Sequence, residues 1–259
     1  FISNWSGDAH PSKLFEGVDK RLSIVLGQRQ CSGNEKSTYT SQYIKWYAKE
    51  RGVLFEIHPS YLPFHNIYDF MFFDGSYPKI GTQVEVDIIK KLKSITSTVG
   101  MTIKEGKHKL YYTRKVSFFL QVLDFIPMVK DNQGILREPS ELKHLSFLSK
   151  LDKDLCLASL STSIFYWFNI INSDCRNLNK REIVSFPIAN KISGIEHRNI
   201  NLLVERLMND YLSNSTIRTI RYVTKGDISV QYFNFRPSKP IIDEIDRVLA
   251  KHYGFTDEE

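Results

Sequence analysis

The segment Leu22–Leu26, with the sequence LSIVL, constrains the fold most because it lies so close to the start of a 259-residue chain. Four of its five residues are large and apolar. A strand of this composition is usually buried on both faces, in the middle of a sheet. The preceding residues offer only one further strand before a loop. The sequence therefore predicts a central strand, and it raises the question of where the rest of its sheet lies.

The overall charge favours a polyanionic partner. Lys and Arg number 35 and Asp and Glu 29, which gives a net charge of +6 and an isoelectric point near 9.0. A surplus of this sign suits nucleic acid. A basic enzyme without such a partner fits the same charge equally well. The hydrophobic share of 42% is ordinary for a folded protein.

The cysteines and the apolar stretches indicate a cytoplasmic protein that does not bind a membrane. Cys31, Cys156 and Cys175 are far apart and form no CxxC pair, which suits a reducing compartment and argues against a zinc site or a disulfide framework. The first ten residues lack the pattern of a signal peptide. The most apolar stretch, 155–171, is too short and too rich in hydroxyl groups to span a bilayer.

Helices and strands are mixed without a regular βαβ order, which predicts the α+β class. A polar turn at 31–38 is the best candidate domain boundary. Thr82 and Glu85 have capping-box spacing at the start of a helix over 81–95. Further elements are expected as a buried helix over 154–171, an amphipathic helix over 199–212, a hairpin over 217–235 and a last helix from 239.

Several well-known catalytic and cofactor motifs are absent from the sequence. The chain has no GxG, no P-loop, no HExxH and no GxSxG. Asp131, Glu141 and Lys143 resemble the D…ExK set with which many nucleases hold magnesium, but that set needs its ExK on a strand. The stretch PSELKHLSFL predicts a helix start with Ser140 as its cap, and Glu141 as an acid of the first turn. We therefore expect no metal site and no cofactor site in this chain.

Four segments together resemble one family. These segments are HPSKLFEGVDKRLSIVLG, YYTRKVSFFLQVLDFIP, STSIFYWFNIINSDCRNLNKREIVSFPI and SKPIIDEIDRVLAKHYGFTDEE. In this order they resemble the C-terminal part of adenine-specific DNA methyltransferases of the type II/IIG restriction–modification kind. The ordered set covers nearly the whole chain, although no single motif is strongly specific. His10 stands where that family often has an arginine.

The resemblance implies three regions in the chain and a role for each. Residues 1–36 would be the last strands of a Rossmann-like methyltransferase sheet, 37–235 the DNA target-recognition region, and 236–259 a C-terminal helix. The loop that binds S-adenosylmethionine and the Asn-Pro-Pro-Tyr motif would lie upstream of Phe1, since this chain contains no Pro-Pro. The implied partners are double-stranded DNA and the upstream catalytic domain. We also expect self-association through the N-terminal strand, and no binding of S-adenosylmethionine by this part alone.

In that family a flipped adenine is held against a stacking aromatic side chain. The resemblance places Phe15, in the loop before the last strand, at about this position. The alternative is that Phe15 packs beneath its loop.

Two basic segments are candidate DNA contacts. In KEGKHKLYYTRK, strand alternation would put Lys107, Lys109 and Tyr111 on one face and Tyr112 and Arg114 on the other. Its candidate contacts are Lys107, Lys109, Tyr112, Arg114 and Lys115. The cations could follow phosphates while the tyrosines stack or donate hydrogen bonds. The alternative is an exposed edge strand protected by charge.

The second segment, SDCRNLNKREI, resembles the loops that read bases in restriction–modification specificity modules. Arginine suits the edge of guanine and asparagine that of adenine. The candidate contacts are Arg176, Asn177, Asn179, Lys180 and Arg181. A solvated turn between a helix and a strand is the alternative. Arg218 and Arg221 form a weaker set, for which a solvated strand face is the simpler interpretation. The competing function for the whole chain is a non-enzymatic specificity module that docks on a separate subunit.

Overall fold

The computed structural model describes residues 1–6, 15, 21–28, 37–53, 56, 60–116, 119–189, 192–223 and 226–259. The chain forms two compact units. Unit 1 comprises Phe1–Ser94, Phe168–Cys175 and Phe255–Glu259, and unit 2 comprises Ile95–Trp167 and Arg176–Gly254. Both helices and strands occur along the chain, which confirms the α+β class. A remnant of a Rossmann-like sheet stays a prediction.

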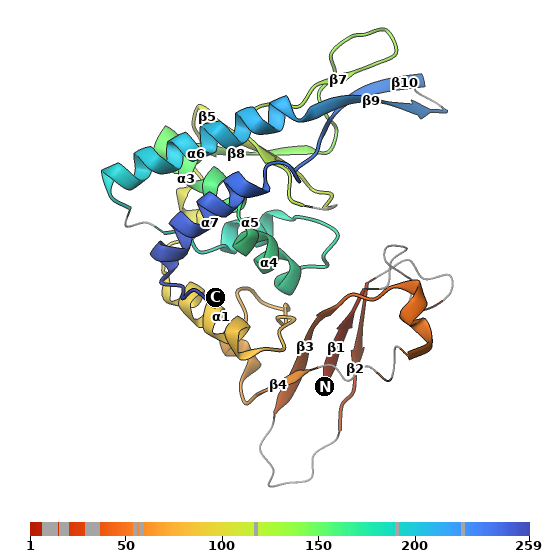
Figure 1. The fold of residues 1–259 in the computed structure, drawn as a ribbon, viewed down its shortest axis with the longest axis vertical. Helices are drawn as coiled ribbons and strands as arrows, with labels where there is room; N and C mark the ends of the chain where they lie inside the picture. The colour runs from red at the N-terminus through yellow and green to blue at the C-terminus, as the bar shows by residue number, and fades with distance from the viewer. Residues whose placement is uncertain are drawn as a thin grey trace. The chain divides into compact units, whose positions relative to one another are not determined.

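Unit 1 contains a four-stranded sheet in the order β2-β1-β3-β4 (Figure 1). The strands are β1 (Ile2–Trp5), β2 (Leu22–Val25), β3 (Thr38–Ile44) and β4 (Tyr61–Phe64). Strand β1 pairs antiparallel with β2 and parallel with β3, and β3 pairs antiparallel with β4. The rest of the sheet therefore comes from both sides of the loop near residue 36, so that boundary does not separate the two units.

The prediction that Leu22–Leu26 is a central, fully buried strand is wrong. Strand β2 lies at the edge of its sheet, and the side chains of Val25 and Leu26 are 66% and 67% exposed. Only one face is covered, because Leu22 and Ile24 pack against the cluster of buried tryptophans in unit 1. An apolar run cannot by itself distinguish a strand covered on two faces from one covered on a single face.

The remainder of unit 1 includes helix α1 (Gln83–Ser94) and short 3-10 helices at Ala48–Val53 and Ile67–Phe70. The predicted capping box at the start of α1 is confirmed. The Glu85 carboxylate accepts hydrogen bonds from the backbone N–H groups of Gly81 and Thr82 at 2.9 and 3.1 Å, and the Glu85 N–H donates to Thr82 Oγ1 at 3.4 Å. These bonds satisfy N–H groups that have no partner within the helix.

Unit 2 contains two three-stranded antiparallel sheets. One has the order β6-β5-β8, with β5 (His108–Thr113), β6 (Val122–Leu123) and β8 (Leu142–Phe147). The other has the order β7-β10-β9, with β7 (Val129–Lys130), β9 (Ser215–Tyr222) and β10 (Gly226–Phe233). The predicted hairpin is confirmed as β9 and β10. The predicted helix after Ser140 is wrong, because residues 142–147 form β8 and pair along the whole of β5.

The predicted single helix over 154–171 is two helices, α3 (Lys150–Leu160) and α4 (Ser163–Asn172), bent by 68°. The hydroxyl groups that separate the two apolar runs cause the break. Thr162 Oγ1 accepts from the N–H of Phe165 at 3.1 Å and so caps α4. Among the described residues no single helix is long and apolar enough to cross a membrane, although this bent pair together reaches the length and composition.

The other helices of unit 2 are α2 (Val99–Thr102), α5 (Lys180–Ser185), α6 (Gly194–Ser213) and α7 (Lys239–Tyr253). Helix α3 packs on β5 and β8, α6 packs on α3, and α7 packs on α6 (Figure 1). The predicted stripe of α6 is buried, except that Leu212 is exposed. This stack of helices fixes β5 at the centre of its sheet.

Candidate nucleic-acid interface

Strand β5 presents two different faces. Leu110 and Tyr112 are buried, whereas Lys109 is exposed and Tyr111 is half-buried, as the predicted alternation requires. Strand β6 pairs with β5 at Tyr111 and Tyr112, so the alternative of an exposed edge strand is wrong for this half of β5, whereas the half with Lys109 pairs with β8 alone among the described strands. Tyr112 is only 5% exposed, and burial raises the pKa of its phenol. This side chain therefore supports the site from within the core.

Beyond the end of β5 the chain meets the loop between α4 and α5. Lys115 forms an isolated antiparallel bridge with Asn177. The Arg114 carbonyl accepts from the N–H of Leu178 at 2.7 Å, and the N–H of Val116 donates to the Arg176 carbonyl at 2.9 Å. Backbone hydrogen bonds thus join the two basic segments that the sequence predicts separately. We call the combined surface the basic patch, and its members are Arg114, Lys115, Arg176, Asn177, Asn179, Lys180 and Arg181.

The loop that carries half of the basic patch is held by local structure. Leu178 is fully buried and anchors the loop in the core. Asn179 is the N-cap of α5, and its N–H donates to Glu182 Oε2 at 2.9 Å in a capping box. The spacing of Asn179 and Glu182 is the sequence signal that could have revealed this cap.

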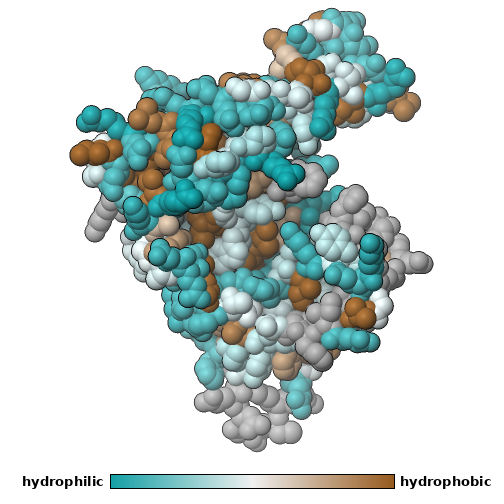
Figure 2. Space-filling view, viewed as in Figure 1, coloured by the Kyte–Doolittle hydropathy of each residue, from teal (hydrophilic) through white to brown (hydrophobic). Residues whose placement is uncertain are grey.

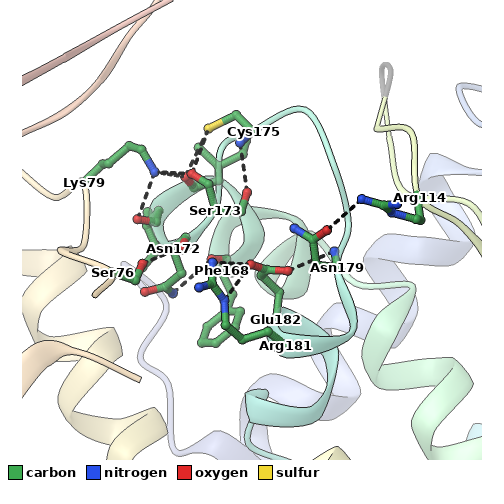
Figure 3. Close-up of polar contacts among 12 residues, drawn as sticks. Ser76, Lys79, Arg114, Phe168, Asn172, Ser173, Cys175, Asn179, Arg181 and Glu182 are labelled. Carbon is green, nitrogen blue, oxygen red and sulfur yellow. Dashed lines mark hydrogen bonds and ion pairs between the residues drawn. The ribbon is translucent and has the colours of Figure 1, made fainter. Parts of the chain in front are cut away.

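Glu182 holds the Arg181 side chain and the Asn179 backbone of the basic patch. Its carboxylate is completely buried, and Oε1 accepts from Arg181 Nε and Nη2 at 3.3 and 3.1 Å. Arg114 Nη2 in turn donates to Asn179 Oδ1 at 3.3 Å (Figure 3). A buried carboxylate needs such partners because burial removes its hydration. The sequence analysis did not identify Glu182 as part of the site.

The basic patch is strongly cationic at its surface. Its three arginines and two lysines are all exposed, whereas Glu182 lies beneath them. Guanidinium groups present several donors in a fixed plane, which suits phosphate oxygens and the guanine edge. Asparagine amides carry a donor and an acceptor together, which suits the adenine edge. The arrangement can therefore contact both the backbone and the bases of DNA.

The other candidate cations lie elsewhere in unit 2. Lys107 is exposed just before β5. Arg218 and Arg221 belong to β9, in the other sheet. The Arg218 guanidinium lies 3.4 Å from the centre of the Tyr232 ring, and Arg221 Nε is 3.0 Å from an Asp227 carboxylate oxygen. Figure 2 shows this sheet at the upper right with apolar atoms among the polar ones. These contacts agree with the simpler interpretation of a solvated strand face.

Two further candidates stand apart from the basic patch. Phe15 is 50% exposed, and its neighbours in the loop lie outside the described residues. Asp131 is committed to its own turn, since Oδ1 accepts from the N–H groups of Gln133 and Ile135 and Oδ2 from Arg137 Nε. Within the described part of the chain, no three His, Cys, Asp or Glu side chains lie where they could hold a metal ion together.

The described cysteines are buried thiols. Cys156 and Cys175 are both free, and burial raises the pKa of Cys156 to about 12. A thiol with such a pKa is almost wholly protonated at neutral pH and is a poor nucleophile. Cys31 lies outside the described residues.

No protein-family model, curated protein or solved structure matches this chain.

Proposed function

We propose that this chain is the DNA-recognition part of a site-specific, S-adenosylmethionine-dependent adenine DNA methyltransferase of a restriction–modification system. One observation carries the proposal. The end of β5 and the α4–α5 loop, each a candidate DNA contact by sequence, join through backbone hydrogen bonds into one exposed basic patch. Five exposed cations thereby lie on two segments that are distant in the sequence and adjacent in the structure.

In this proposal the members of the basic patch divide into two kinds. Lys115 and Lys180 contact phosphates, which positions the protein without reading sequence. Arg176, Asn177 and Arg181 read base edges, and the pairing of Arg181 with Glu182 fixes the guanidinium before DNA arrives.

The methyl transfer itself is assigned to the parent protein. The S-adenosylmethionine loop and the catalytic motif would lie upstream of Phe1, and Phe15 would stack on the flipped adenine. Among the described strands β2 pairs with β1 alone, and such an edge suits a sheet that continues with further strands. The buried free thiols of Cys156 and Cys175 suit a cytoplasmic location.

A salt titration of duplex binding tests the proposal. Each phosphate contact releases condensed counterions, so the two contacts made by Lys115 and Lys180 should contribute roughly −2 to the log–log slope. Lys115→Ala and Lys180→Ala should each flatten the slope by about one unit. Lys90→Ala is the matched control, since this exposed lysine belongs to α1 of unit 1. If Lys115→Ala and Lys180→Ala leave the slope as unchanged as Lys90→Ala does, the proposal is contradicted.

The same exposed edge of β2 favours the second candidate, a non-enzymatic module that docks on a separate methyltransferase or nuclease subunit. The coding sequence upstream of Phe1 separates the two. A glycine-rich loop and an Asn-Pro-Pro-Tyr-like motif there support the enzyme, and an upstream region without them supports the module.

A further inference from the structure

A second surface of β5 lies outside the basic patch. Its residues are Lys109 and Tyr111 of β5 and His144 and Ser146 of β8, which we call the outer face. Helix α3 packs on this sheet, where Leu110, Tyr112, Leu145 and Phe147 are buried. The alternating residues point to the opposite side. Lys109 and His144 are exposed, and Tyr111 and Ser146 are half-buried.

Two rings meet at the centre of the outer face. Tyr111 lies directly opposite His144 in the antiparallel register, and directly opposite residues share a face. Their ring centroids are 6.5 Å apart and their planes are inclined by 54°. On the other flank Tyr111 is opposite Leu123 of β6, which is fully buried. The half-buried tyrosine therefore has the buried Leu123 on one side and the exposed His144 on the other.

Cations lie at both ends of these rings along β5. Lys107 and Lys109 are exposed at the start of the strand, and Lys115 is exposed just beyond its end. Alternate residues of a strand are separated by roughly 6.6 Å, so Lys109 comes within reach of a group stacked on Tyr111. Glu105 and Glu141 are the exposed acids nearest in the sequence. Neither is one of the four residues of the outer face.

We infer that the outer face binds an unpaired strand of nucleic acid, with one base stacked on Tyr111, a neighbouring base stacked on His144, and flanking phosphates near Lys107 and Lys109. A sheet face with aromatic residues and adjacent cations supplies both interactions. The rings favour an unpaired strand over a duplex, because a paired base is stacked on its neighbours and offers no free π-face. Stacking tolerates any base, so the inference extends beyond the duplex recognition assigned to the basic patch.

Fluorescence anisotropy with labelled fifteen-nucleotide oligomers of thymidine and of uridine tests the inference on the whole chain. Tyr111→Ala and His144→Ala should each weaken binding roughly 5- to 150-fold, the equivalent of one stacked base. Tyr111→Phe should bind like the wild type, because it keeps the ring. Tyr222→Ala is the matched control, since Tyr222 is an exposed tyrosine of β9. Binding of either oligomer supports the inference, and the oligomer that binds shows whether the outer face takes DNA or RNA.

Two results would overturn it. One is failure of both oligomers to bind the wild type, and the other is unchanged binding by Tyr111→Ala and His144→Ala. Photocrosslinking of a 5-iodouracil oligomer to the unmodified protein covers the case in which Tyr111→Ala does not fold. The adduct should map to the peptide of Tyr111 or His144, and an adduct elsewhere refutes the site. Duplex binding is measured in parallel and depends on Lys115 and Lys180. Loss of duplex binding alone would count against the proposed function, and loss of oligomer binding alone would count against the outer face.

Discussion

Replacing Glu182 by Gln should both destabilise the protein and weaken its binding to DNA. The carboxylate is completely buried and accepts from the Asn179 N–H with one oxygen and from Arg181 with the other. Glutamine has a single carbonyl oxygen, so it can satisfy only one of these donors. Arg181 is half-exposed and can turn to water, which limits its loss. The remaining loss is the buried NH2 group of the glutamine, which replaces the oxygen facing Arg181 and has no acceptor there, and it costs about 1–3 kcal/mol.

The assay is urea unfolding, followed by circular dichroism and compared with Glu205→Gln. Glu205 is exposed and 3.7 Å from Lys150, so its substitution should change the free energy of unfolding by less than about 0.5 kcal/mol. Equal stability of the Glu182 and Glu205 variants would show that the buried carboxylate and its ion pair with Arg181 contribute nothing measurable.

The direction in which Glu182→Gln changes the affinity for duplex DNA distinguishes a positioning role of Glu182 from a simple effect of its charge. Glu182→Gln removes one negative charge, so the net charge rises from +6 to +7, and long-range electrostatics alone predicts tighter binding. If Glu182 positions Arg181, the freed side chain must be ordered again on binding, which costs about 0.5–1.5 kcal/mol, or a loss of roughly 2- to 12-fold. Tighter binding of the variant to duplex DNA would refute the positioning role.

Two further substitutions test the packing of unit 2. Burial raises the pKa of Asp246, whose Oδ1 accepts from the N–H of Ser163 at 2.9 Å. A raised folded pKa means that stability is lost as the pH rises through it, so Asp246→Asn should be more stable than the wild type at pH 7, with the gain vanishing below that pKa in urea titrations. Gly106→Ala should cost about 1–3 kcal/mol, because a Cβ there would lie 2.2 Å from the Phe147 carbonyl oxygen. Gly194→Ala, with no atom within 4 Å of its Cβ, should leave the free energy of unfolding nearly unchanged in the same urea titrations.

Helices with local signals could be predicted from the sequence, and surfaces made by distant contacts could not. The cap formed by Thr82 and Glu85 and the stripe of α6 depend on residues three or four apart, so a short window reveals them. The sequence predicts a helix at β8 because Ser140 and Glu141 also fit a helix start. Its true state is decided by pairing with β5, more than twenty residues earlier. Non-local pairing overrides local propensity in this way.

In the candidate site, too, local features could be predicted from the sequence and contacts between distant segments could not. The basic residues and the alternation of β5 were available from the sequence, because side chains of a strand alternate whatever its neighbours are. The junction of Lys115 with Asn177 was not available, since nothing local specifies which loop the end of β5 meets. Glu182 escaped notice for a related reason, because a carboxylate among basic residues resembles a solvated counter-charge until its burial is known.

The two nucleic-acid surfaces proposed on β5 depend on one register. Leu110 and Tyr112 are buried, and this burial fixes which side chains face outward. A slip of one residue would bring Lys109 and Tyr111 into the core and expose the two apolar positions, at the cost of an unpaired buried ammonium group. The strand therefore presents Lys109 and Tyr111 on the outer face, while Arg114 and Lys115 lie beyond its end, where the chain leaves the sheet to pair with residues 176–178. The apolar residues of β5 thus determine where its cations act.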